Sequence, residues 1–133
     1  NTIIEIDPSI IRFTHSRIRP FFSGCGKRIT ETIQEILDNR ITVDQLPMIS
    51  VIKIENEYYS LNNRRLYVIK ELIKQGSNNK IFVRVKDQSE KEKTRYTVER
   101  CSLTSTLMHE YTTNNTTNNN NDDDDEESYF QND

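Results

Sequence analysis

Tyr58-Tyr59-Ser60-Leu61-Asn62-Asn63-Arg64-Arg65-Leu66 is the stretch that decides the fold, because a strand pattern changes into a helix pattern within it. The two tyrosines are typical of a β-strand. From Leu66 onward, leucine or isoleucine at positions 66, 69, 72 and 73 has the spacing of one helix face, and Gly76 predicts where the helix ends. The stretch therefore predicts a strand, a turn and a helix that begins with two adjacent arginines.

Arg64 and Arg65 lie where an anion is favoured. The first N–H groups of a helix have no partner within the helix, and the positive end of the helix dipole lies there. Arginine adds forked donors that match phosphate oxygens, and since adjacent residues point in different directions we expect one of the pair to face a ligand. Two solvated first-turn residues are the alternative, although cations at this helix end oppose the dipole.

The remaining segments predict an α/β fold with a small mixed sheet and two main helices. An apolar strand at 81–85 is expected to pair in parallel with an earlier strand, with the helix as the crossover. A loop is expected at 88–93, an edge strand at 96–98, and either a helical turn or a loop at 104–111. Before the decisive stretch we expect a short strand at 10–13, extended chain at 17–20, a helix from 29 to about 38, a capped turn at 42–45 and a strand at 48–54 covered on both faces.

Charge and composition divide the chain into a domain at 1–111, with its core at 17–85, and a tail at 112–133. The tail is rich in Asn and Asp and has too few apolar residues to offset its ordering entropy, so we expect it to be disordered. The 18 basic and 14 acidic residues before Thr112 give the domain a charge of +4, and 7 acidic residues lie beyond it. The tail is interpreted either as a solubilising segment or as a tethered competitor for a basic site.

Cysteine and histidine contents exclude several classes of protein. Cys25 and Cys101 do not make a disulfide framework, and with His15 and His109 they lack the spacing of a zinc site, so we expect no metal centre built from these side chains. A signal peptide and an apolar membrane span are both absent from the sequence. These features predict an intracellular protein, cytoplasmic or nuclear, that is not embedded in a membrane.

The stretch at 62–65 resembles a short box of the ParB/sulfiredoxin-like superfamily. It is similar to the Gly-Glu-Arg-Arg type of box in ParB-like domains and to the Gly-Cys-His-Arg box of sulfiredoxins, each of which follows a hairpin strand and opens a helix. Ile18-Arg19-Pro20 before a helix, and then Leu46-Pro47 before an apolar strand, resembles the order of elements in sulfiredoxins. The resemblance covers about half of the chain and implies a ParB/sulfiredoxin-like fold.

The resemblance also implies roles for the residues of the box. Arg64 and Arg65 match its phosphate-contacting end. Asn62 stands where the family usually has glycine, so a positive φ, which asparagine tolerates, is expected there. Asn63 stands where sulfiredoxins have their catalytic cysteine, or Arg64 does if the match slips by one position. A thiol is absent from both positions, so sulfiredoxin activity is not expected.

Residues outside the box complete the implied site. The resemblance sets Arg28 near a phosphate-contacting position, and Glu31 where ParB-like nucleotidases and related free-serine kinases carry an acidic residue. Glu31 would then be a general base or help to hold Mg²⁺, and its alternative role is that of a carboxylate favoured by the helix dipole. Arg19 is a further candidate for phosphate binding. His15 is near enough in sequence to border the site, and an ordinary loop histidine is the alternative.

These residues predict binding of a nucleotide, ATP in the first instance, with Mg²⁺. Hydrolysis of the nucleotide and phosphoryl transfer to a small molecule both stay open. One alternative function is a non-enzymatic nucleic-acid-binding module, although the chain shows neither a large basic stripe nor a helix-turn-helix pattern. Another is a degenerate scaffold that keeps the fold for contacts with protein partners of unknown identity.

Overall fold

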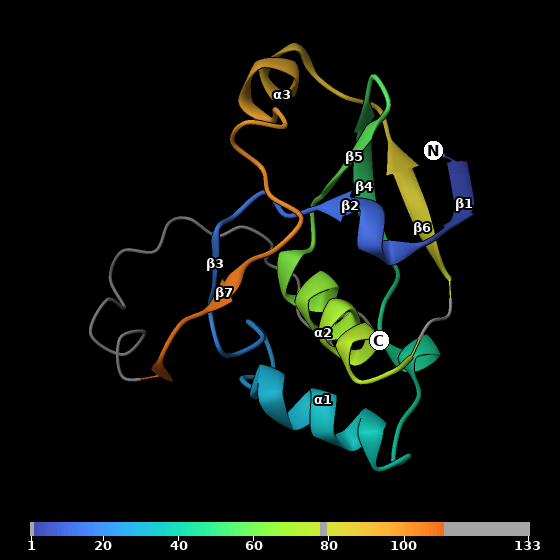
Figure 1. The fold of residues 1–133 in the computed structure, drawn as a ribbon, viewed down its shortest axis with the longest axis vertical. Coiled ribbons are helices and arrows are strands. Elements are labelled where there is room, and N and C mark those ends of the chain that lie inside the picture. The colour runs from blue at the N-terminus through green and yellow to red at the C-terminus, as the bar shows by residue number, and fades with distance from the viewer. Residues whose placement is uncertain (1, 78–79, 111–133) are drawn as a thin grey trace.

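The structure is a computed structural model, and it describes residues 2–77 and 80–110. The tail predicted at 112–133 lies outside these residues. The chain runs through the elements drawn in Figure 1 in the following order: β1 (Thr2–Ile6), η1 (Pro8–Ile10), β2 (Ile11–Arg12), β3 (Arg17–Ile18), α1 (Ile29–Leu37), η2 (Val43–Gln45), β4 (Ile49–Ile54), β5 (Glu57–Ser60), α2 (Asn63–Lys74), β6 (Ile81–Lys86), α3 (Glu90–Arg95) and β7 (Thr106–Leu107).

Within the described ranges, five strands form a mixed sheet in the order β1-β6-β4-β5-β2. β4 pairs in parallel with β6 and antiparallel with β5, so both the crossover through α2 and the hairpin are confirmed. β1 and β2 add the two edge strands, antiparallel to β6 and parallel to β5 respectively. Both edge strands come from residues before Arg17, and β2 lies within the short strand expected at 10–13. A separate parallel pair joins β3 to β7.

Helix α2 lies between the sheet and α1, which explains why its apolar surface extends beyond one face (Figure 1). Leu66 and Ile69 belong to the core between α2 and the sheet, which also contains Val51 of β4. Val68 belongs to a second core with Ile29 of α1. The molecule thus has a sheet layer and two helix layers, and α2 contributes to both cores.

Strand β4 is covered on both faces, as its continuous apolar run predicts. All four residues from Ile49 to Ile52 are buried. Ile52 pairs with Tyr59 of β5, and the Tyr59 ring stacks on Tyr96 with 5.8 Å between the ring centroids. The segment after α3 therefore covers part of the sheet face opposite α2.

Two predictions for the region after β6 are wrong. The expected loop at 88–93 contains α3, whose start is fixed by a capping box: Ser89 Oγ accepts from Glu92 N–H at 3.2 Å, and Glu92 Oε1 accepts from Ser89 N–H at 2.8 Å. The expected edge strand at 96–98 is turn and irregular chain, because Tyr96 is used for stacking on the sheet and not for pairing along its edge. The undecided segment at 104–111 contains β7.

None of the helices in the described residues has both the length and the apolar character to cross a membrane.

Candidate functional site

Two asparagine amides attach the start of α2 to neighbouring segments. Asn62 Oδ1 accepts from the backbone N–H of Ser50 in β4 at 2.7 Å. Asn63 Oδ1 accepts from the backbone N–H of Thr14 at 2.9 Å, and Asn63 Nδ2 donates to Thr14 Oγ1, also at 2.9 Å. Both asparagines are buried. These bonds fix where the first turn of α2 lies, because a buried amide is costly unless its polar atoms are satisfied.

The expectation of a positive φ at Asn62 is wrong. Its φ is −133° and its ψ is 72°, outside the left-handed region that favours glycine. The turn needs the side-chain amide of Asn62, which accepts the bond from Ser50, and glycine would not supply that amide. Positive φ among non-glycine residues in the described chain is found at Asn39, after α1, and at Glu55, in the hairpin.

Arg65 ties the first turn of α2 to the start of β4. Arg65 is only 5% exposed, and its Nη1 atom donates to the carbonyl oxygen of Met48 at 3.0 Å. A carbonyl acceptor for the guanidinium partly offsets the cost of burying it. The fold therefore uses Arg65 as a connection between α2 and β4.

Arg64, unlike Arg65, lines a small cavity of about 30 Å³. The residue is 6% exposed; its Nη1 atom is buried and makes no hydrogen bond in the described chain, while the residue has other interactions. The cavity brings Arg64 together with Arg19, which lies 45 residues earlier in the sequence. The described residues that line it are His15, Arg17, Ile18, Arg19, Asn63, Arg64 and Met108.

The charge around this cavity, which we call the basic cavity, favours an anion. Three arginines and one histidine line it, and the described lining contains no carboxylate. It also lies at the N-terminus of the twelve-residue helix α2, where the dipole and the first N–H groups favour negative charge. Guanidinium groups bind phosphate and carboxylate oxygens through forked, charge-assisted hydrogen bonds. These features favour an oxyanion at the cavity, with room inside for only part of it.

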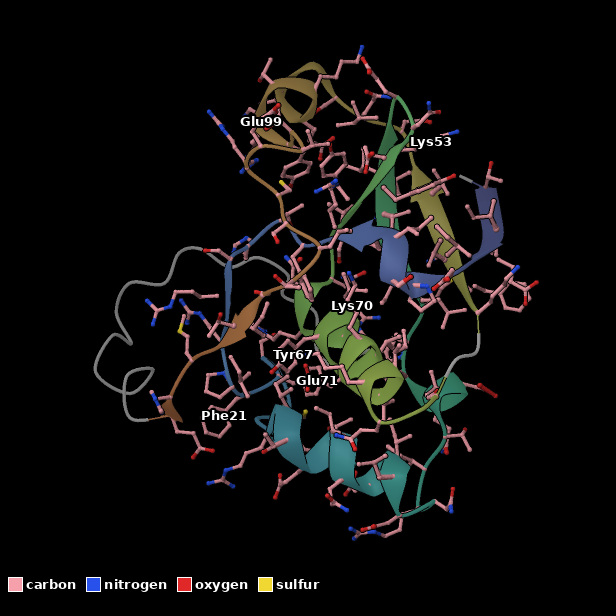
Figure 2. All side chains as sticks on the ribbon, viewed as in Figure 1. Phe21, Lys53, Tyr67, Lys70, Glu71 and Glu99 are labelled. Carbon is pink, nitrogen blue, oxygen red and sulfur yellow. The ribbon has the colours of Figure 1, made fainter. Side chains whose placement is uncertain are left out.

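Arg28 and Glu31 are not among the described residues that line the basic cavity. Arg28 Nε lies 2.9 Å from Glu110 Oε2, and its Cζ atom lies 5.5 Å from the centroid of the Phe21 ring. Figure 2 shows Phe21 close to the N-terminal end of α1. Glu31 Oε1 accepts from the backbone N–H of Arg28 at 3.2 Å, which is a helix-capping contact. The N-terminal ends of α1 and α2 nevertheless lie on the same side of the molecule, the side of β3 and β7 (Figure 1).

The described residues do not offer a built metal site. Groups of three or more His, Cys, Asp or Glu side chains that could hold a metal ion are absent from residues 2–77 and 80–110. Mg²⁺ prefers carboxylate and phosphate oxygens, and the described lining of the basic cavity supplies only nitrogen donors and an asparagine amide as polar side chains. These side chains do not fit the Mg²⁺ expected from the sequence.

Sequence reasoning did not select Arg17 or Met108 for the site. A signal for Arg17 was present, because Arg17 and Arg19 are two residues apart in extended chain and so share one side of it. Met108 had none, since its place depends on the pairing of β7 with β3, two segments almost ninety residues apart. Short non-local pairs of this kind have no local sequence pattern.

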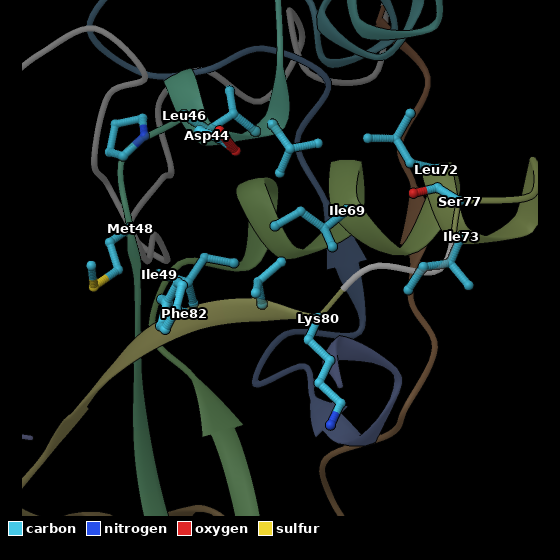
Figure 3. Close-up of a pocket in the computed structure, with 13 residues that line it drawn as sticks. Asp44, Leu46, Met48, Ile49, Ile69, Leu72, Ile73, Ser77, Lys80 and Phe82 are labelled. Carbon is cyan, nitrogen blue, oxygen red and sulfur yellow. The ribbon is translucent and has the colours of Figure 1, made fainter. Parts of the chain in front are cut away.

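A second and larger cavity of about 550 Å³ lies between α2, η2 and the starts of β4 and β6 (Figure 3). Its described lining is mostly apolar, with Asp44, Ser77 and Lys80 as its polar members. Unlike the basic cavity, the described lining of this cavity has one acidic and one basic side chain, Asp44 and Lys80, and no cluster of basic ones. Its larger size therefore does not make it the better candidate for binding a phosphate.

Comparison of the chain with models of known protein families finds no match, and a search of curated proteins finds none either.

Proposed function

We propose that this chain binds the phosphate group of a nucleotide, with ATP as the first candidate, in the basic cavity. The observation that carries the proposal is the convergence of Arg19 and Arg64 on one cavity, together with Arg17 and His15. These side chains come from β3, its flanking residues and α2. A charge of +4 on the domain, counted to residue 111, is consistent with an anionic ligand.

The volume of the basic cavity restricts how much of the ligand enters it. A cavity of about 30 Å³ has room for only one or two groups of the size of a water molecule. One phosphate oxygen would lie inside, where it accepts from Arg64, and the rest of the phosphate would lie at the mouth near Arg17 and Arg19. The nucleoside would stay outside the cavity, so we expect recognition of phosphate to be stronger than recognition of the base.

We also propose that the domain belongs to the ParB/sulfiredoxin-like superfamily. In support, β3, α1, β4, β5 and α2 follow one another in the order that the resemblance implies, and α2 begins with Asn63-Arg64-Arg65 directly after the hairpin. Two departures from the family pattern are Asn62, whose amide is used by the turn, and the missing thiol at positions 63 and 64. Sulfiredoxin chemistry stays outside the proposal.

The proposal extends to binding and stops before a reaction. Hydrolysis or phosphoryl transfer needs a group that positions or deprotonates the nucleophile. Glu31, the candidate for that role, caps α1 and is not among the described residues that line the cavity. A catalytic role for Glu31 stays a prediction that needs a ligand large enough to reach both helix N-termini.

Substitution of Arg19 tests the proposal without removing a buried side chain, since Arg19 is only half-buried. Arg19→Gln is expected to weaken ATP binding by about 10- to 100-fold, because one charge-assisted hydrogen bond is worth roughly 1.5–3 kcal/mol. Arg40→Gln is the matched control: Arg40 follows α1 at its other end and pairs with Asp38. Both variants of the full chain are titrated with ATP, ADP and inorganic phosphate by calorimetry.

Amide shifts in an NMR titration locate the ligand and separate the alternatives. Shifts at residues 17–19 and 63–66 with ATP and with inorganic phosphate would support the proposed site. Flat spectra at millimolar ATP and phosphate would overturn it and favour a scaffold. Binding of a DNA duplex in the absence of nucleotide, with affinity that falls steeply as salt rises, would favour the nucleic-acid module.

A further inference from the structure

The last described residues run along the basic cavity. Met108 donates its backbone N–H to the carbonyl oxygen of Ile18 at 2.8 Å, and its side chain belongs to the lining of the cavity. Two residues later, Glu110 pairs with Arg28 at 2.9 Å. The described chain therefore ends two residues after Met108, which lines the cavity.

The chain beyond this point carries a strong negative charge. Asp122 to Glu127 are six consecutive acidic residues, and every Lys and Arg of the sequence lies at or before Arg100. Asp122 follows Glu110 by twelve residues, a length of chain that spans at most about 40 Å. That reach exceeds the radius of gyration of a domain of this size, about 13 Å. The acidic run can therefore reach the cavity from its own attachment point.

We propose that Asp122–Glu127 docks on the basic cavity as an internal anion and competes with the phosphate ligand. A carboxylate offers the same kind of acceptor oxygens as a phosphate to the guanidinium groups of Arg19 and Arg64. Attachment within the same chain gives the acidic run an effective concentration on the order of millimolar, so even weak contacts compete. The inference rests on the proposed function for the identity of the ligand with which the tail competes.

The test uses the full chain and changes the charge of the tail alone. In the neutral-tail variant, Asp122, Asp123, Asp124 and Asp125 are replaced by Asn, and Glu126 and Glu127 by Gln. The control variant changes four neighbouring positions and leaves the charge intact; its substitutions are Asn118→Gln, Asn119→Gln, Asn120→Gln and Asn121→Gln. ATP affinity is measured by calorimetry at about 50 mM and 300 mM salt, where the Debye lengths differ. Amide spectra of the three proteins are compared without ligand.

Competition predicts that the neutral-tail variant binds ATP about tenfold more tightly at the lower salt concentration, with a smaller difference at the higher one. The control variant is expected to bind like the wild type. Without ligand, the neutral-tail variant should differ from the wild type in amide shifts at residues 17–19 and 63–64.

The two readouts distinguish failure of this inference from failure of the proposed function. Amide differences at the cavity without ATP binding by any variant would support docking of the tail and overturn the nucleotide proposal. Equal ATP affinities and identical amide shifts at the cavity would overturn docking, whereas ATP binding in the same experiment would leave the proposed function intact.

Discussion

At the start of α2, four consecutive polar residues have three different tasks. The amides of Asn62 and Asn63 hold β4 and the segment after β2, and Arg65 holds the start of β4. Arg64 alone among the four combines charge with a place in the basic cavity. The sequence indicates that the polar residues at this strand-to-helix turn have a role in structure or binding. Which atoms of which segment they reach depends on the packing of the sheet, so the division of tasks could not be predicted.

Lys70 is a single residue whose loss we expect to be costly. Its Nζ donates to the carbonyl oxygens of Ile11 at 2.6 Å and Leu103 at 2.7 Å, so it joins α2 to β2 and to the segment before β7. Burial lowers the pKa of Lys70 to about 8, which leaves the ammonium charged at pH 7. Lys70→Met should lower the free energy of unfolding by about 1–3 kcal/mol at pH 7, because it leaves carbonyl groups without their donor.

Urea unfolding of Lys70→Met and of a matched Lys74→Met variant measures this effect. Lys74 lies one turn further along α2, and its side chain is 67% exposed and paired with Glu71. We expect Lys74→Met to unfold close to the wild-type urea midpoint. Equal midpoints for the two variants would show that the carbonyl contacts of Lys70 add nothing to stability.

At the scale of elements, local patterns succeeded for the two helices with an apolar face and for the cap at Thr42. The apolar spacing predicted α1 and α2, and the capping box at Thr42 predicted η2, where Thr42 N–H donates to Gln45 Oε1 at 2.8 Å. The same kind of box at Ser89 was present but hidden by the charged residues around it, so α3 was missed. Strands β3 and β7 have two residues each and depend on each other, which no local pattern reveals.

The stack of Tyr96 on Tyr59 joins the end of α3 to the sheet, and its contribution can be tested at the level of the element. Since Tyr96 stacks on Tyr59, Tyr96→Ala should lower stability by about 1–2 kcal/mol through lost aromatic burial. We expect hydrogen exchange of the backbone amides of α3 to accelerate more than exchange in α2. Val98→Ala is the control, because Val98 is 44% exposed. Unchanged exchange in α3 would mean that the helix is held by other contacts.

On the scale of the whole molecule, the apolar cores and the basic cavity lie in different places. The two apolar cores meet at α2, whereas the basic cavity lies at one end of α2, where β3, β7 and the first helical turn come together. A ligand at this end would contact segments that are distant in sequence and close only after folding. The fold class was therefore predictable from sequence, while the full membership of the site needed the tertiary arrangement.

The two thiols report whether the segment after α3 is docked on the rest of the molecule. Cys101 is 4% exposed, its carbonyl oxygen accepts from Arg12 Nη1 at 2.8 Å, and burial raises the pKa of its thiol. Cys25 is exposed. Because the thiolate is the reactive form, iodoacetamide at pH 7.5 should modify Cys25 rapidly and Cys101 only slowly, by more than about tenfold. Peptide mass spectrometry over time measures both rates, and urea should make them similar. Equal rates in the absence of urea would contradict the docking of this segment, and with it the path by which the chain reaches the basic cavity.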